Sequence, residues 1–134
     1  MTRPFFLCAL ALALAACHRE KDPMPDVFPQ DAGPWHRTAL RELRAAEAPD
    51  PVPPAGIERI RSASYQGPGK LDVRVYQMSS PAVALDMVQR WNAAPDTVFF
   101  YGGRFFAVVR WESAERKALH AFVGVLESKL NAKR

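Results

Sequence analysis

Polar and apolar residues alternate most regularly in the second half of the chain, where they predict β-strands. In segment 71–78, Leu71, Val73 and Val75 point to one side of a strand, while polar and aromatic residues point to the other. Segment 57–65 is predicted as a further strand with less regular alternation. Gln66-Gly67-Pro68-Gly69 has the composition of a turn, so the two segments are expected to form a pair of strands.

The clearest predicted element is a β-hairpin formed by segments 97–101 and 104–111. Gly102-Gly103 separates them, and a two-residue glycine loop is favoured in hairpins. With this loop, Phe100 faces Phe105 and Phe99 faces Phe106. One face of the hairpin is then wholly apolar and is expected to face the core: Val98, Phe100, Phe105, Ala107, Val109 and Trp111.

Three segments have the apolar spacing of amphipathic helices. The first, 34–48, starts at Pro34 and ends before a proline-rich stretch; the second starts at Ser80-Pro81, with Ser80 as the expected cap. The third is expected to be capped by Ser113, with Glu115 in its first turn. Their apolar stripes are Trp35, Ala39, Leu40, Leu43 and Ala46; Ala84, Met87, Val88 and Trp91; and Leu119, Phe122, Val123, Leu126 and Leu130.

The order of these elements, α-ββα-ββα, predicts an α+β domain with an antiparallel four-stranded sheet and helices packed on one face. Two arrangements stay open for the helix at 34–48. It covers the other face of the sheet, or it leaves that face exposed, because the prolines that follow it allow it to swing away.

A short apolar run precedes the domain. Arg3 supplies a positive charge, and segment 5–16 has no charged residue; it is too short to span a bilayer and is typical of a secretory signal peptide. The run ends in Leu14-Ala15-Ala16-Cys17, which resembles the lipobox of bacterial lipoproteins. The resemblance implies cleavage before Cys17 and attachment of several lipid chains to it, enough for stable anchoring. His18 follows this cysteine, and the absence of an aspartate at that position resembles lipoproteins that are sent to the outer membrane.

These patterns divide the chain into a signal peptide (1–16), a lipidated cysteine with a flexible tether (17–33) and one α+β domain (34–134). The domain comprises the helix at 34–48, a proline-rich spacer at 49–56 and a ββαββα body at 57–134. The expected location is the bacterial cell envelope, on the periplasmic side of the outer membrane. Membrane lipid is the expected partner of Cys17.

Charge and cysteine content narrow the classes of partner. The formal net charge of +4, from 18 basic and 14 acidic residues, is too small to argue for nucleic acid. Segment 104–111 resembles the aromatic octamer of RNA-recognition motifs, but Phe105 stands where glycine belongs, so a buried strand is favoured. Of the two cysteines, only Cys17 survives the expected cleavage, so the domain is expected to have no disulfide.

No catalytic constellation is recognisable in the sequence. The three histidines, His18, His36 and His120, lack metal-ligand spacing, and the serines near helix starts are explained as caps. The sequence therefore predicts no metal, no cofactor and no enzymatic activity.

Residues 65–130 resemble a loosely defined family of uncharacterised exported bacterial proteins. The resemblance rests on segment 71–78, on Ser80-Pro81 at a helix start, and on Gly102-Gly103-Arg104 followed by the aromatic strand. These residues bear on the fold, and the family has no assigned activity to carry over.

One surface is predicted to bind a partner: the outer face of the sheet, where aromatic residues and arginines interleave as at binding hot spots. The predicted function is a non-catalytic interaction or accessory module that binds an envelope protein or small molecule. One alternative is a small-molecule or lipid carrier that uses this face, and another is an envelope hydrolase acting through Asp72, Asp86, Glu112 or His120. The residues of the candidate face are Arg74, Tyr76, Phe99, Tyr101, Arg104, Phe106 and Arg110.

Overall fold

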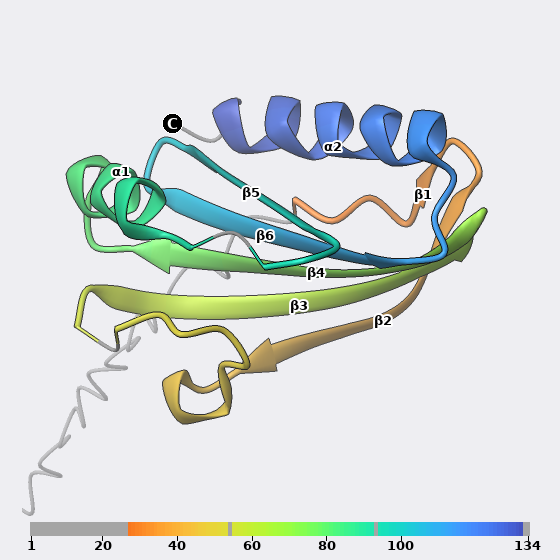
Figure 1. Ribbon diagram of the computed structural model, residues 1–134. Coiled ribbons are helices and arrows are strands. Elements are labelled where there is room, and N and C mark those ends of the chain that lie inside the picture. Colours follow the sequence, from red (N-terminus) through yellow and green to blue (C-terminus); the bar gives the residue numbers. More distant parts are fainter. Residues whose placement is uncertain (1–26, 54, 93, 133–134) are drawn as a thin grey trace, which may run out of the picture.

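The computed structural model describes residues 27–53, 55–92 and 94–132. In these residues six strands form one antiparallel sheet, in the order β1-β2-β3-β4-β6-β5, with two α-helices (Figure 1). The α+β antiparallel class is as predicted, but the sheet has six strands rather than four. The elements are β1 (Asp31–Ala32), β2 (Trp35–Leu43), a short 3-10 helix η1 (Ala45–Glu47), β3 (Ile57–Gly67), β4 (Gly69–Met78), α1 (Pro81–Arg90), β5 (Thr97–Gly102), β6 (Phe105–Glu112) and α2 (Arg116–Asn131).

The hairpin of β3 and β4 confirms the predicted turn. Gly67 pairs with Gly69 on either side of Pro68, and the pairing then runs along both strands to Ile57 and Met78. Gly69 has φ 124°, and a Cβ there would lie 2.7 Å from the Cα of Ala114. Only glycine fits this position, because the chain enters α2 directly above the turn.

The hairpin of β5 and β6 forms with its predicted faces but in a different register. Gly102 pairs with Phe105, so that Tyr101 faces Phe106 and Phe99 faces Val108. The loop is therefore Gly103-Arg104, and Gly103 adopts the positive φ of 56°. Each residue faces a partner two positions from the predicted one, and a shift of two leaves every side chain on its predicted face. The predicted apolar face is accordingly part of the core.

The predicted helix at 34–48 is wrong, because this segment forms strand β2 and the short helix η1. A β-bulge between Arg37 and Ala39 shifts the alternation by one residue. Trp35 before the bulge and Leu40 after it belong to one core cluster, whereas Leu43 belongs to another. Their spacing therefore mimics a helical period although they lie on a strand, with Trp35 and Leu43 buried on opposite faces of the sheet.

The two helices pack on opposite faces of the sheet, which corrects the prediction that they share one face. α2 contributes Leu119, Phe122 and Leu126 to a cluster with the inward side chains of β3, β4 and β6, and the sheet curls around this helix (Figure 1). We call this the inner face. α1 contributes Ala84 and Met87 to a second cluster on the other face, the outer face.

The segment before β2 belongs to the folded body. Val27 and Phe28 are buried in the inner cluster, and Tyr65 donates a hydrogen bond from its hydroxyl to the Pro29 carbonyl at 2.7 Å. The predicted tether at 17–33 therefore extends too far, since residues 27–33 pack on the sheet and include β1.

Both helix starts are capped by side chains. Ser80 accepts a hydrogen bond from the Val83 amide at 3.3 Å, as predicted for α1. For α2 the cap is Glu115, which accepts from the Lys117 and Ala118 amides, and not Ser113, whose φ is 52°. These two amides lower the pKa of the Glu115 carboxyl.

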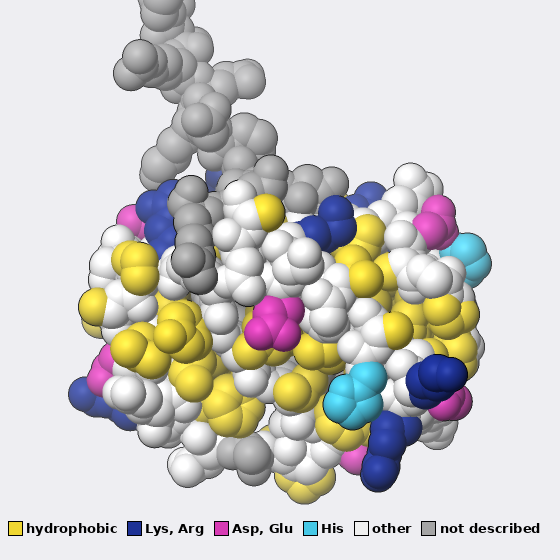
Figure 2. All heavy atoms as spheres, turned by 90° about the horizontal axis from the view of Figure 1, so that it is seen from above, with side chains coloured by type: hydrophobic (Ala, Val, Ile, Leu, Met, Phe, Trp, Pro, Cys, Tyr) yellow, Lys and Arg dark blue, Asp and Glu magenta, His cyan; other side chains and the backbone are white. Residues whose placement is uncertain are grey.

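Seen from the α2 side, hydrophobic side chains are spread over both halves of the molecule, and most charged side chains lie around the rim (Figure 2). This face is formed by a helix whose apolar stripe is already buried on the sheet.

Trp35 is expected to contribute strongly to stability. Its indole is fully buried, meets Phe122 edge-on with ring centroids 6.4 Å apart, and donates from Nε1 to the Ala118 carbonyl at 3.0 Å. Trp35→Ala is predicted to lower the free energy of unfolding by about 3–5 kcal/mol, measured by urea denaturation. The matched control is the exposed neighbour, His36→Ala, with an effect within about 1 kcal/mol. Equal losses would contradict the placement of β2.

Candidate functional site

The outer face of the sheet is ordered in rows that run across the strands. The pairing registers place Ile60, Tyr76 and Phe106 in one row, at the end of the sheet near α1. Ser62, Arg74 and Val108 form the next row, and Ser64, Asp72 and Arg110 form the one after it. The face thus changes from apolar at one end to polar at the other.

The apolar end is covered by α1. Trp91, which follows this helix, lies with its ring centroid 5.0 Å from that of Phe106, and the rings of Tyr76 and Phe106 are 6.0 Å apart. Tyr76 and Phe106 are fully buried. These two residues, predicted on a binding face, are therefore core residues on that face.

The middle row, which contains Arg74, is covered by the segment before β3, and an ion pair joins the two. Arg74 donates from Nη2 to Asp50 Oδ1 at 2.9 Å and from Nε to Oδ2 at 2.5 Å, a two-point contact. The Tyr76 hydroxyl also donates to Asp50, and Arg74 Nη1 donates to Asp72 Oδ2 at 2.7 Å. Asp50 and Val52, both in the stretch predicted as a spacer, thus pack on the sheet.

Burial and Asp50 shift the pKa values of this network. Burial and the hydrogen bond to Asp50 raise the pKa of Tyr76 far above its usual range, so its hydroxyl remains a donor. Burial by itself lowers the pKa of Arg74, but the bonds and charge of Asp50 outweigh it and raise that pKa overall. The network is therefore held together by the contacts of Arg74 and Tyr76 with Asp50.

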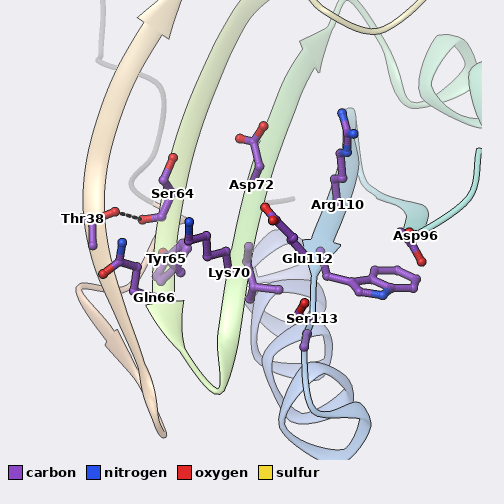
Figure 3. A pocket seen from close by; sticks show the side chains of 13 residues that line it. Thr38, Ser64, Tyr65, Gln66, Lys70, Asp72, Asp96, Arg110, Glu112 and Ser113 are labelled. Atoms are coloured by element: carbon purple, nitrogen blue, oxygen red, sulfur yellow. Dashed lines mark hydrogen bonds between the residues drawn. The ribbon is translucent and has the colours of Figure 1, made fainter.

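The polar end of the outer face is open and forms a hollow of about 720 Å³. In Figure 3 the side chains of Ser64, Asp72 and Arg110 extend to the same side of the sheet, away from α2. A smaller hollow of about 290 Å³ adjoins it, shares Ser64 and Asp72, and reaches Arg74. The larger hollow is lined by Thr38, Ser64, Tyr65, Gln66, Lys70, Leu71, Asp72, Asp96, Arg110, Trp111, Glu112, Ser113 and Ala114.

The hollow contains charged side chains that have no ion-pair partner among the described residues. Lys70 lies opposite Glu112 and Asp72 lies opposite Arg110 in the strand register. Within the described ranges, however, Lys70, Arg110 and Glu112 form no salt bridge, and Asp72 is bound by Arg74. Two cations and a carboxylate are thus available to a ligand at the edge of a shallow, polar surface.

The predicted face residues are divided among different environments. Phe99 is half-buried against Trp91, with ring centroids 6.1 Å apart, and Tyr101 is 39% exposed on β5. Arg104 lies at the β5–β6 turn, with its Nη1 3.6 Å from Glu58 Oε2. Of the predicted face residues, only Arg110 lines the larger hollow. Cys17 lies outside the described residues.

The candidate residues for a hydrolase do not converge. Asp72 and Glu112 line the hollow, whereas Asp86 is paired with Arg90 on α1 and His120 is exposed on α2. Across the described ranges, no group of three His, Cys, Asp or Glu side chains is placed to hold a metal ion. No described helix is long and apolar enough to cross a membrane.

Asp50 and Lys70 were missed as site residues, for different reasons. Lys70 follows the Gly-Pro-Gly turn and lies outside the predicted strand at 71–78, and Asp50 lies among prolines that indicate only an end to regular structure. Asp72 and Arg74 were recognisable on one face from the alternation. Thr38 was hidden by the helical interpretation of β2.

Comparison with known protein families, with curated proteins and with solved structures finds no match to this chain.

The Asp50–Arg74 pair is expected to dominate the stability of the outer face. Its side chains are 10% and 6% exposed, and removal of one partner leaves a buried charge without compensation. Asp50→Ala is predicted to lower the free energy of unfolding by about 3–5 kcal/mol, measured by urea denaturation. Asp72→Ala removes the other carboxylate on Arg74, but Asp72 is 48% exposed, so we expect about 1 kcal/mol or less. A larger loss in Asp72→Ala would contradict this assignment.

Proposed function

We propose that the chain is a membrane-anchored lipoprotein of the bacterial cell envelope, lipidated at Cys17 and carrying a non-catalytic binding domain. The observation that carries this proposal is the short apolar run that ends in Leu14-Ala15-Ala16-Cys17. His18 after the cysteine favours the outer membrane. The folded body includes Val27, so residues 18–26 separate the lipidated cysteine from it.

The binding role is supported by the polar hollow on the outer face. Lys70, Arg110 and Glu112 there lack salt-bridge partners within the described residues, and Ser64 and Thr38 add hydroxyl groups. Binding sites are usually concave and carry a few polar groups that orient the ligand, and this hollow has both features. The surface suits a polar partner, an envelope protein or a small polar molecule.

The alternative functions have weaker support. A lipid carrier needs an accessible apolar surface. Two of the aromatic residues that suggested one, Tyr76 and Phe106, are buried under α1 and Trp91. A hydrolase needs a nucleophile or activated water beside a base. Asp72 and Glu112 share the hollow, but Asp72 is held by Arg74.

Lipidation is tested by removal of the modified thiol. Cys17→Ala is expected to abolish incorporation of labelled palmitate and to shift the chain out of the membrane fraction, since no diacylglyceryl thioether forms. Cys8→Ala is the matched control, because it removes a cysteine from the segment that is cleaved off, and it should remain labelled and membrane-bound. A wild-type chain that carries residues 1–16 and a bare thiol in intact-mass measurement would overturn the proposal.

The hollow is tested by removal of its free cations. Lys70→Ala combined with Arg110→Ala is expected to weaken partner capture about tenfold, measured by in-cell cross-linking and quantitative mass spectrometry. Arg116→Ala combined with Lys117→Ala removes the same charge from exposed positions on α2 and should leave capture unchanged. An identical partner profile for both double variants would exclude the hollow as the binding site.

A further inference from the structure

The two edges of the sheet differ in how they are protected. Beside β2, the short strand β1 covers the start, a bulge interrupts the strand after Arg37, and Arg41 and Glu42 place charges along the rest. Short cover strands, bulges and edge charges are the devices by which proteins prevent sheets from joining edge to edge. This edge is therefore closed to further strands.

The opposite edge, β5, has none of these devices. It is the last strand of the sheet and pairs only with β6, in a register without a bulge. Segment 97–102, Thr-Val-Phe-Phe-Tyr-Gly, contains no charge and no proline. Such a segment has the β-propensity and apolar character that promote strand addition. Residues 97–100 are half-buried and Tyr101 is exposed, whereas Gly102 is buried beside Leu130 of α2, so the accessible part of the strand is 97–101.

The phase of the β5–β6 ladder shows which backbone groups are free. The Trp111 amide donates to the Asp96 carbonyl at 3.0 Å, so alternate residues from Asp96 onward, Val98 and Phe100 among them, bond to β6. The amides and carbonyls of Thr97, Phe99 and Tyr101 consequently point away from β6. They form an unpaired row along the edge.

This row is complementary to itself in one antiparallel register. With Phe99 opposite Phe99 of a second copy, Thr97 lies opposite Tyr101, and every outward amide meets an outward carbonyl. The uncharged strand creates no repulsion, and Asp96 comes opposite Gly102 of the second copy, two residues from its Arg104. An aromatic pair at the centre adds to the stability of such a ladder.

We propose that β5 is a self-association surface, through which two copies of this chain join antiparallel into one continuous sheet. Each copy contributes the same strand, so the contact is isologous and closes as a twofold dimer. The β5 edge adjoins the hollow at Asp96, but the inference does not depend on whether the hollow binds a ligand.

The register is tested by cysteine cross-linking of the full-length chain in isolated membranes under mild oxidation. In the proposed dimer, positions 97 and 101 of opposite copies have Cα atoms about 5.5 Å apart, within reach of a disulfide. The double variant Thr97→Cys, Tyr101→Cys should form a disulfide-linked dimer, with position 97 joined to position 101 in mapped peptides. Each single variant should form no disulfide-linked dimer, since identical positions are offset by about 13 Å along the strands and cannot be bridged. Absence of the dimer, or equal dimer in the single variants, would overturn the proposal.

A second pair of variants separates the backbone contact from the side chain. Tyr101→Pro deletes an amide that β6 does not use, so the body should fold while the ladder between copies is blocked. Tyr101→Ala removes the same ring and keeps the amide, so it should remain dimeric. Sedimentation in detergent, with circular dichroism as the folding check, should give monomer mass for Tyr101→Pro and twice that mass for wild type and Tyr101→Ala. A monomeric wild type, or a dimeric Tyr101→Pro, would contradict self-association.

Discussion

The architecture is governed by how much of a six-stranded sheet two helices can cover. α2, with 16 residues, lies along the inner face, and the sheet curls around it so that this face is buried from β3 to β6. α1 is seen end-on in Figure 1 while the strands run across the view. A helix that crosses the strands covers a width of about 10 Å, whereas a strand of the length of β4 extends for about 33 Å. The outer face is therefore covered by a helix at one end only.

The sequence of β4 follows this division of the outer face. Tyr76 lies under α1, Arg74 lies under the segment that carries Asp50, and Asp72 borders open solvent. A buried arginine is tolerated in the middle position because Asp50 satisfies it at two points and the Tyr76 hydroxyl shares the same carboxylate. The Asp50–Arg74 ion pair thus lies at the border between the core and the surface, and the hollow begins on its solvent side.

Most of the fold could be predicted from the sequence because its local signals agree with its packing. The alternation of β4, the Ser80-Pro81 helix start and the glycine loop of β5 and β6 each decide a structure over a few residues. The error in the predicted register of that hairpin left the predicted faces unchanged, because the shift was two residues. The predictions that failed depend on contacts between residues far apart in the sequence. Neither the partner of Arg74 nor the helix that covers Phe106 is visible from local periodicity, so the predicted binding face combined core residues with surface residues.

The bulge in β2 explains both the largest error and the asymmetry of the sheet. It shifts Leu40 onto the same face as Trp35, which gives the spacing of a helix to a strand. The same irregularity disrupts the free edge of β2 and makes it a poor template for another strand. β5 has no bulge, which is why its alternation was easy to recognise. The regularity that made β5 predictable is also what leaves its backbone groups in the straight, uncharged row that a second strand requires.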